Sequence, residues 1–180
     1  MRLRFRRARL LAPLLAPLVM PMALAGCGPG RNQFPPSCPA IRPLPEAASL
    51  RRFRPGSHDV TGLMLQGRIV AANGKCRRVD DGAAVAARLT LTMRLTRGPA
   101  TPPGGVPVPY FLAVSRGGRI LTKATFSSPV KFPPGQDTVT ATTSPFDLRF
   151  PVRREGGAAA YTIWVGFQLT PGEFAAEGGR

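Results

Sequence analysis

Few side chains in this sequence could do chemistry: three cysteines, one histidine and one pair of adjacent acids. His58 precedes Asp59, but it follows a Pro-Gly turn signal at 55–56, and adjacent strand residues point to opposite faces. The acids Asp80 and Asp81 precede a glycine, as in an ordinary turn, and a calcium site would need more oxygen ligands. No nucleophile elbow, phosphate-binding loop or dinucleotide-binding pattern occurs. We therefore expect no metal site, no bound cofactor and no enzymatic activity.

Cys27 follows a segment with the order of a secretory signal. Five arginines lie within the first nine residues, and an uncharged apolar run follows over residues 10–25. This run is shorter than the roughly 20 residues that a membrane-spanning helix needs, and it contains three prolines. The tetrad Leu-Ala-Gly-Cys at 24–27 resembles the bacterial lipobox. The resemblance implies that residues 1–26 are a lipoprotein signal peptide, and that a diacylglycerol is attached to the Cys27 sulfur.

Gly28 and the segment after it indicate how the chain is held. In some bacteria an aspartate at this position retains lipoproteins in the inner membrane, so Gly28 favours the outer membrane. We expect a lipid-anchored protein of the cell envelope that faces the periplasm. Residues 27–45 are rich in Pro and Gly and lack an apolar period, which predicts an extended tether.

Cys38 and Cys76 form an even pair once Cys27 is assigned to lipid. In an oxidising compartment we expect them to form a disulfide. It would close a loop of ~39 residues, for which chain entropy predicts a stabilisation of about 4 kcal/mol. The alternative, a metal site, would need more soft ligands than two cysteines and one histidine.

The chain is strongly basic, with 25 Lys and Arg against nine Asp and Glu and a formal charge of +16. Removal of residues 1–26, which hold five Arg and no acid, leaves 20 basic and nine acidic residues, or +11. We expect partners such as an envelope protein, an anionic envelope polymer or lipid head groups, and no nucleic acid. The candidate contact residues are Arg51, Arg52, Arg54 and Trp164. The alternative is a solvated surface of arginine-rich composition.

The patterns in the remaining sequence predict β-strands. Residues 84–97, 146–152 and 161–169 alternate between apolar and polar side chains, which is typical of strands with one buried face. Over residues 46–180 we predict about seven strands in an all-β, antiparallel β-sandwich, immunoglobulin-like in the broad sense. A small β-barrel is the alternative. Trp164 alternates away from the inward-facing set, so it is either an exposed contact residue or a residue covered by the tether or by arginine stems.

Three local expectations follow from turn residues. The Asn-Gly pair at 73–74 predicts a turn between two strands, and Gly117-Gly118 predicts a hairpin in which Arg116 pairs with Arg119. In an unbroken register, one face of this hairpin would carry Phe111, Ala113, Ser115, Ile120, Ala124 and Phe126. Residues 170–180 have the composition of a turn and a tail.

Several motifs carry a family resemblance: the tetrad, the Cys-Pro after it, "RFRPG", "GKC", "RGPA", the segment "YFLAVSRGGRILTKATF" and the terminal "YTIWVGFQLTPGEF". Together they resemble a group of uncharacterised proteobacterial envelope lipoproteins with a two-cysteine β-domain. The resemblance implies an envelope lipoprotein and transfers no functional residues. We therefore expect a membrane-anchored, non-enzymatic binding or structural module. The alternative is a periplasmic carrier or chaperone for an apolar or anionic ligand, which would need a cavity of hundreds of Å³.

Overall fold

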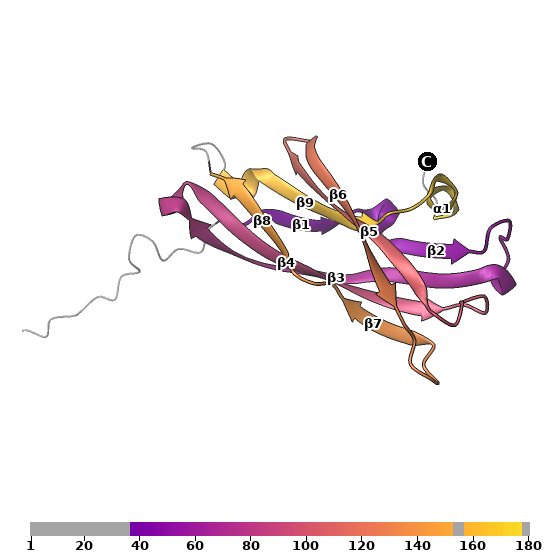
Figure 1. Cartoon of the computed structure of the whole chain (residues 1–180). Coiled ribbons are helices and arrows are strands. Elements are labelled where there is room, and N and C mark those ends of the chain that lie inside the picture. Colours follow the sequence, from indigo (N-terminus) through magenta and orange to yellow (C-terminus); the bar gives the residue numbers. More distant parts are fainter. Residues whose placement is uncertain (1–36, 153–156, 178–180) are drawn as a thin grey trace, which may run out of the picture. The chain divides into compact units, whose positions relative to one another are not determined.

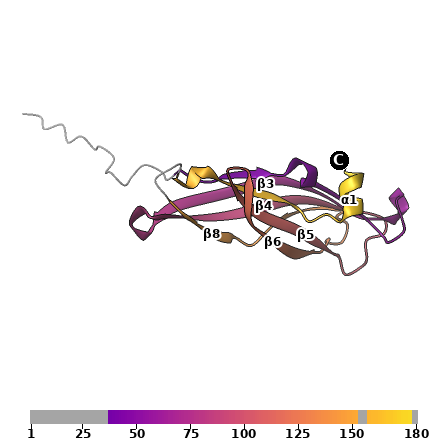
Figure 2. The ribbon, with the colours of Figure 1, turned by 90° about the horizontal axis from the view of Figure 1, so that it is seen from above.

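The computed structural model describes residues 37–152 and 157–177, so Cys27, the predicted signal peptide and much of the predicted tether lie outside the described residues. Nine strands form two sheets whose inner faces share one apolar core, which confirms the predicted β-sandwich over the closed barrel. The long axis of the sandwich follows its two longest strands, β3 (Leu63–Val79) and β4 (Ala84–Arg97) (Figures 1 and 2). No helix among the described residues is long and apolar enough to cross a membrane.

The first sheet, sheet A, has the order β1-β9-β5-β6. Its strands are β1 (Ala40–Pro43), β9 (Tyr161–Phe167), β5 (Val106–Arg116) and β6 (Arg119–Val130). Strand β1 is parallel to β9, and the other pairs are antiparallel. Ile41 of β1 pairs with Ile163 and packs against the core. This part of the predicted tether therefore belongs to the sandwich.

The second sheet, sheet B, has the order β2-β3-β4-β7, and β8 also pairs with β4. The strands other than β3 and β4 are β2 (Ser49–Phe53), β7 (Thr138–Thr142) and β8 (Phe146–Pro151). The C-terminal part of β4 pairs with β7 and its N-terminal part with β8. Between β7 and β8, the buried Thr143 satisfies the backbone of β4. The Leu91 amide donates to Thr143 Oγ1 at 3.1 Å, and the Thr143 amide donates to the Leu91 carbonyl at 2.9 Å.

Strand β3 continues straight through the Asn-Gly pair at 73–74, so the prediction of a turn there is wrong. The chain turns instead at η3 (Asp80–Gly82), where all three residues have positive φ. Gly74 pairs with Leu89, and a Cβ at Gly74 would lie 2.6 Å from Ile41 Cδ1. Its lack of a side chain therefore lets β1 approach β3, and this packing overrides the local turn preference.

The β5–β6 hairpin turns at Gly117-Gly118 with Arg116 opposite Arg119, as predicted. A bulge between Val114 and Ser115 then shifts the register, so that Phe111 pairs with Thr125 and not with Ala124. The predicted grouping of Phe111 with Phe126 on one face is therefore wrong. Phe126 instead pairs with Tyr110, on the core face.

The core is built from the inward residues of both sheets, as the alternation of β4 and β9 predicts. Its largest fully buried side chains are Phe167, Leu50, Leu65, Leu89, Leu91, Met93, Leu95, Ile163, Val85, Val108 and Val165. The predicted Cys38–Cys76 disulfide is present, with Cα atoms 6.0 Å apart, and ties the segment ahead of β1 to β3.

Short helical turns connect the strands: η1 (Pro45–Ala47), η2 (Val60–Gly62) and η4 (Gly157–Ala160). After β9 the chain forms α1 (Pro171–Ala176), so the predicted turn and tail at 170–180 is wrong for these residues. A capping box starts the helix, because Thr170 Oγ1 accepts from the Glu173 amide and the Glu173 carboxylate accepts from the Thr170 amide.

We expect Phe167→Ala to lower the free energy of unfolding by about 3–5 kcal/mol, because a fully buried ring is replaced by a cavity. Trp164→Ala, on the outer face of the same strand, should cost less because Trp164 is only partly buried. Urea unfolding of both variants and the parent chain measures the two costs. A larger loss for Trp164→Ala would contradict this assignment of the two faces of β9.

Candidate anion-binding groove

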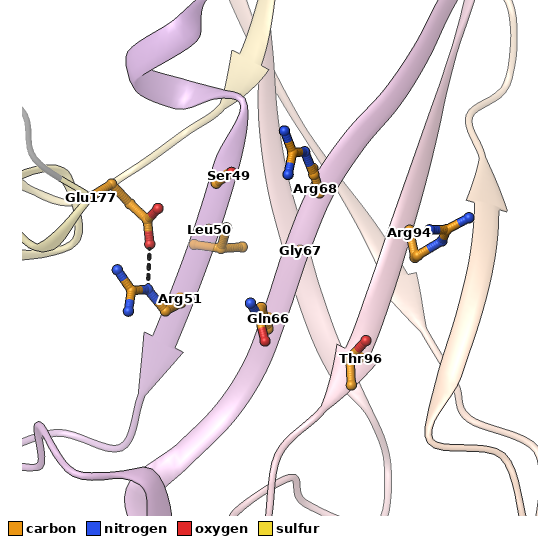
Figure 3. A pocket seen from close by; sticks show the side chains of 9 residues that line it. All are labelled: Ser49, Leu50, Arg51, Gln66, Gly67, Arg68, Arg94, Thr96 and Glu177. Atoms are coloured by element: carbon orange, nitrogen blue, oxygen red, sulfur yellow. Dashed lines mark hydrogen bonds and ion pairs between the residues drawn. The ribbon is translucent and has the colours of Figure 1, made fainter.

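An open groove of about 410 Å³ lies on the outer face of sheet B, where β2, β3 and β4 run side by side (Figure 3). Its floor is sheet backbone, and most of its side chains are polar or positively charged. The lining residues are Ser49, Leu50, Arg51, Gln66, Gly67, Arg68, Arg94, Thr96 and Glu177.

Two arginines on neighbouring strands line this groove, and Figure 3 shows their side chains pointing away from each other. Arg68 of β3 pairs in register with Arg94 of β4, and both side chains are exposed. Neither makes an ion pair or a side-chain hydrogen bond within residues 37–152 and 157–177. Like charges directly opposite in a sheet destabilise it. The groove therefore holds two positive charges that the described protein does not neutralise.

Three arginines of sheet B outside the groove have carboxylate partners. Arg88 lies 3.9 Å from Asp147, Arg97 Nε donates to Asp137 at 2.6 Å, and Arg149 pairs with Asp80. None of these six residues lines the groove. Arg68 and Arg94 are therefore open to an external anion, as are Lys75, Arg77 and Arg78 of β3, which also have no ion pair among the described residues; only Arg68 and Arg94 of these line the groove.

Polar neighbours surround the two arginines in two cross-strand rows of sheet B. These rows are Ser49, Arg68, Arg94 and Thr140, and then Arg51, Gln66, Thr96 and Thr138. Guanidinium, amide and hydroxyl groups can all donate hydrogen bonds to the oxygens of a phosphate or carboxylate, and the guanidinium bonds are charge-assisted. The chemistry of the groove therefore matches an oxyanion.

Strand alternation separates Arg51 from Arg52, although both were predicted to be contact residues. Arg51 lies in the groove, and its Nε donates to Glu177 Oε1 at 2.8 Å. Arg52 points the other way, where its Nε donates to Glu173 Oε1 at 2.7 Å and its Nη1 to the Pro107 carbonyl at 3.1 Å. Both arginines thus hold the C-terminal segment against β2.

The pKa of Glu173 reflects this contact. Burial raises the pKa, but hydrogen bonds from Arg52 and from the Thr170 amide, with the charge of Arg52, outweigh it. The pKa of the Glu173 carboxyl therefore lies below its ordinary value, and the group is ionised at neutral pH. The Glu177 side chain is mostly buried at the edge of the groove, where its charge offsets that of Arg51.

The structure does not bring the other candidate contact residues to the groove. Arg54 is exposed after the end of β2. Trp164 lies on the outer face of sheet A, where its Nε1 donates to Ser115 Oγ at 2.9 Å and its ring packs against a small apolar cluster. Leu44, from the range predicted as tether, packs against the same cluster, and Trp164 is partly buried.

His58 and Asp59, two further residues that could do chemistry, lie just before η2. His58 is exposed in the loop before η2, and the Asp59 carboxylate caps η2 by accepting from the Thr61 and Gly62 amides. The hydrogen bonds from Thr61 and Gly62 lower the pKa of Asp59. No group of three His, Cys, Asp or Glu side chains that could hold a metal ion occurs in the described part of the chain.

Sequence reasoning missed Arg68, and it placed Arg94 only on the solvated face of its strand. The alternation of residues 84–97 shows that Arg94 points outward. Its partner on the next strand depends on register, and β3 contains a bulge between Ile69 and Ala71 that no sequence pattern marks. Comparison with known proteins adds no relative, because no protein-family model, curated protein or solved structure matches the chain.

Proposed function

We propose that this chain is a lipid-anchored lipoprotein of the bacterial cell envelope whose β-sandwich is a non-enzymatic binding module for an anionic envelope polymer. The observation that carries the binding role is the Arg68–Arg94 pair, which is in register, exposed and without a carboxylate partner among the described residues. The formal charge of +11 after residue 26 supports the same class of partner. The signal-like order of residues 1–26 and the tetrad ending at Cys27 support the anchor.

An oxyanion between the two guanidinium groups would act in two ways. It would replace their repulsion by attraction, and it would accept charge-assisted hydrogen bonds from both side chains. Gln66 and Thr96, the next residues along β3 and β4 on the same face, could donate further bonds. Successive anionic groups of a polymer would then follow the outer face of sheet B.

We expect the double variant R68Q/R94Q to bind lipopolysaccharide or purified peptidoglycan about tenfold more weakly, or worse, than the parent chain, because charged hydrogen bonds contribute most of the attraction. Co-sedimentation with each polymer measures the affinity. Both arginines are exposed, so the fold should be retained.

The matched control is R88Q/R149Q. It removes the same number of positive charges from the same sheet, but from arginines that already have carboxylate partners. We expect this control to bind both polymers nearly as well as the parent chain. Equal losses in the two double variants would show attraction by overall charge alone and would contradict a role for the groove.

The anchor has its own test. We expect Cys27→Ser to abolish incorporation of a fatty-acid probe and to release the protein from the membrane fraction of the producing cells, because a serine cannot carry the thioether-linked lipid. Metabolic labelling followed by fractionation measures both effects. Undiminished label on the variant would contradict the assignment of Cys27.

A further inference from the structure

The closed end of the β5–β6 hairpin carries two neighbouring apolar side chains that face solvent. Ile120 is 56% exposed and Leu121 is 45% exposed. The bulge in this hairpin leaves Leu121 without a register partner, since Ser115 pairs with Ile120 and Val114 pairs with Thr122. Bulges commonly re-aim side chains in this way. The other exposed large apolar residues of the described chain, Val60, Val70 and Phe174, are not adjacent in sequence.

The same hairpin is positively charged. Arg116, Arg119 and Lys123 lie close to the apolar pair in sequence, and neither β5 nor β6 contains an acidic residue. Arg116 and Lys123 lie over the rings of Tyr161 and Phe111, so both side chains are positioned by sheet A while keeping their charge. Exposed aliphatic side chains on a hairpin that carries cations and no acid match the surface of an anionic bilayer, in which the apolar groups enter between head groups and the cations meet phosphates.

The position of the hairpin end in sheet A supports this partner. Ala40, Thr162, Ser115 and Ile120 lie on one cross-strand row of the four strands. The row places the start of β1 roughly 14 Å from Ile120, at three strand spacings. In Figure 1 the closed end of the hairpin projects past β9 at the end where β1 begins.

The chain ahead of β1 leads back to Cys27. Ala40 lies thirteen residues after Cys27, and an extended chain of that length spans at most about 45 Å. The disulfide of Cys38 holds this end of the domain to β3. A lipid on Cys27 would therefore keep the hairpin end within reach of the bilayer surface.

We propose that this hairpin end, residues 116–123, is a second membrane contact, which inserts Ile120 and Leu121 among the head groups of an anionic bilayer. The inference rests on the proposed lipid anchor for its biological setting. The contact supplies a second signal beside the acyl chains and limits the orientations of the domain at the membrane.

The test uses a chain that starts at Gly28 and therefore carries no lipid. All described strands, the disulfide and the core lie between Cys38 and Glu177, so this chain contains the whole described fold. We expect it to bind vesicles of phosphatidylethanolamine and phosphatidylglycerol in preference to vesicles of phosphatidylcholine. The variant I120S/L121S should bind the anionic vesicles about tenfold more weakly, because it loses the buried apolar area of two side chains.

Two controls make the result specific. V60S changes another exposed apolar residue, which lies in η2 before the start of β3, and should leave vesicle binding unchanged. R88Q/R149Q should retain vesicle binding, because both arginines lie on the other sheet and have carboxylate partners, and R68Q/R94Q is measured beside it. Thermal melts of all variants check that the fold persists.

The proposal is overturned if the parent chain does not bind anionic vesicles, or if I120S/L121S binds them as well as the parent chain does. Loss of binding in R68Q/R94Q alone would assign the lipid contact to the groove instead. Failure of the lipid anchor is seen separately, in the labelling of Cys27, and does not alter the vesicle result.

Discussion

Each residue of β4 that enters the core turns its neighbour outward, and this constraint determines the surface as well as the interior. Leu91, Met93 and Leu95 are fully buried, so Thr92, Arg94 and Thr96 must face solvent. The antiparallel ladder with β3 then sets the neighbour of each outward residue. Because a slip of one residue would expose the apolar set, the core keeps Arg94 on the outer face, and the observed register places Arg68 opposite it.

Stability does not require arginine at these two positions. Threonine occupies the outward positions on both sides of Arg94, and it is favourable in strands. Two neutral residues would avoid the repulsion between the guanidinium groups. An anion from outside would relieve this repulsion, and this is why we propose the binding role here.

The two proposed contacts occupy different sheets and therefore do not compete for space. The groove lies on sheet B, whereas Ile120 and Leu121 lie on β6 of sheet A, in the cross-strand row where β1 begins. Strand β1 joins sheet A directly after the disulfide. The chain that leads back to Cys27 therefore enters the domain in the same cross-strand row as the hairpin end. A domain held at one end by lipid and hairpin would leave the outer face of sheet B open to a polymer.

Patterns within one strand could be read from the sequence, whereas features set by contacts between strands could not. The alternation of β4 and β9 gave their buried faces correctly, and the cysteine count predicted the disulfide. The pair at 73–74 has a turn preference, but the approach of Ile41 to Gly74 keeps β3 extended. The extra residue Leu121 in β6 placed Phe126 on the core face, opposite to Phe111, without any local signal.

Helix α1 was not predicted, although the sequence contains a helix-start pattern. Thr170, Pro171 and Glu173 have the spacing of a capping box with proline at the first helical position. The candidate site also combines a feature of one strand with a feature set by contacts between strands. The outward direction of Arg94 was readable from the sequence, but its pairing with Arg68 depends on a register that contains a bulge.

A double-mutant cycle on Arg68 and Arg94 tests the central claim most directly. The free energy of unfolding is measured for the parent chain, R68T, R94T and R68T/R94T in the absence of any polyanion. The account predicts a repulsive coupling of about 0.2–1 kcal/mol between the two arginines. This coupling should shrink as added salt shortens the screening length below about 10 Å. An attractive coupling, or one that salt does not change, would contradict the claim that the groove holds two unneutralised charges for an anionic ligand.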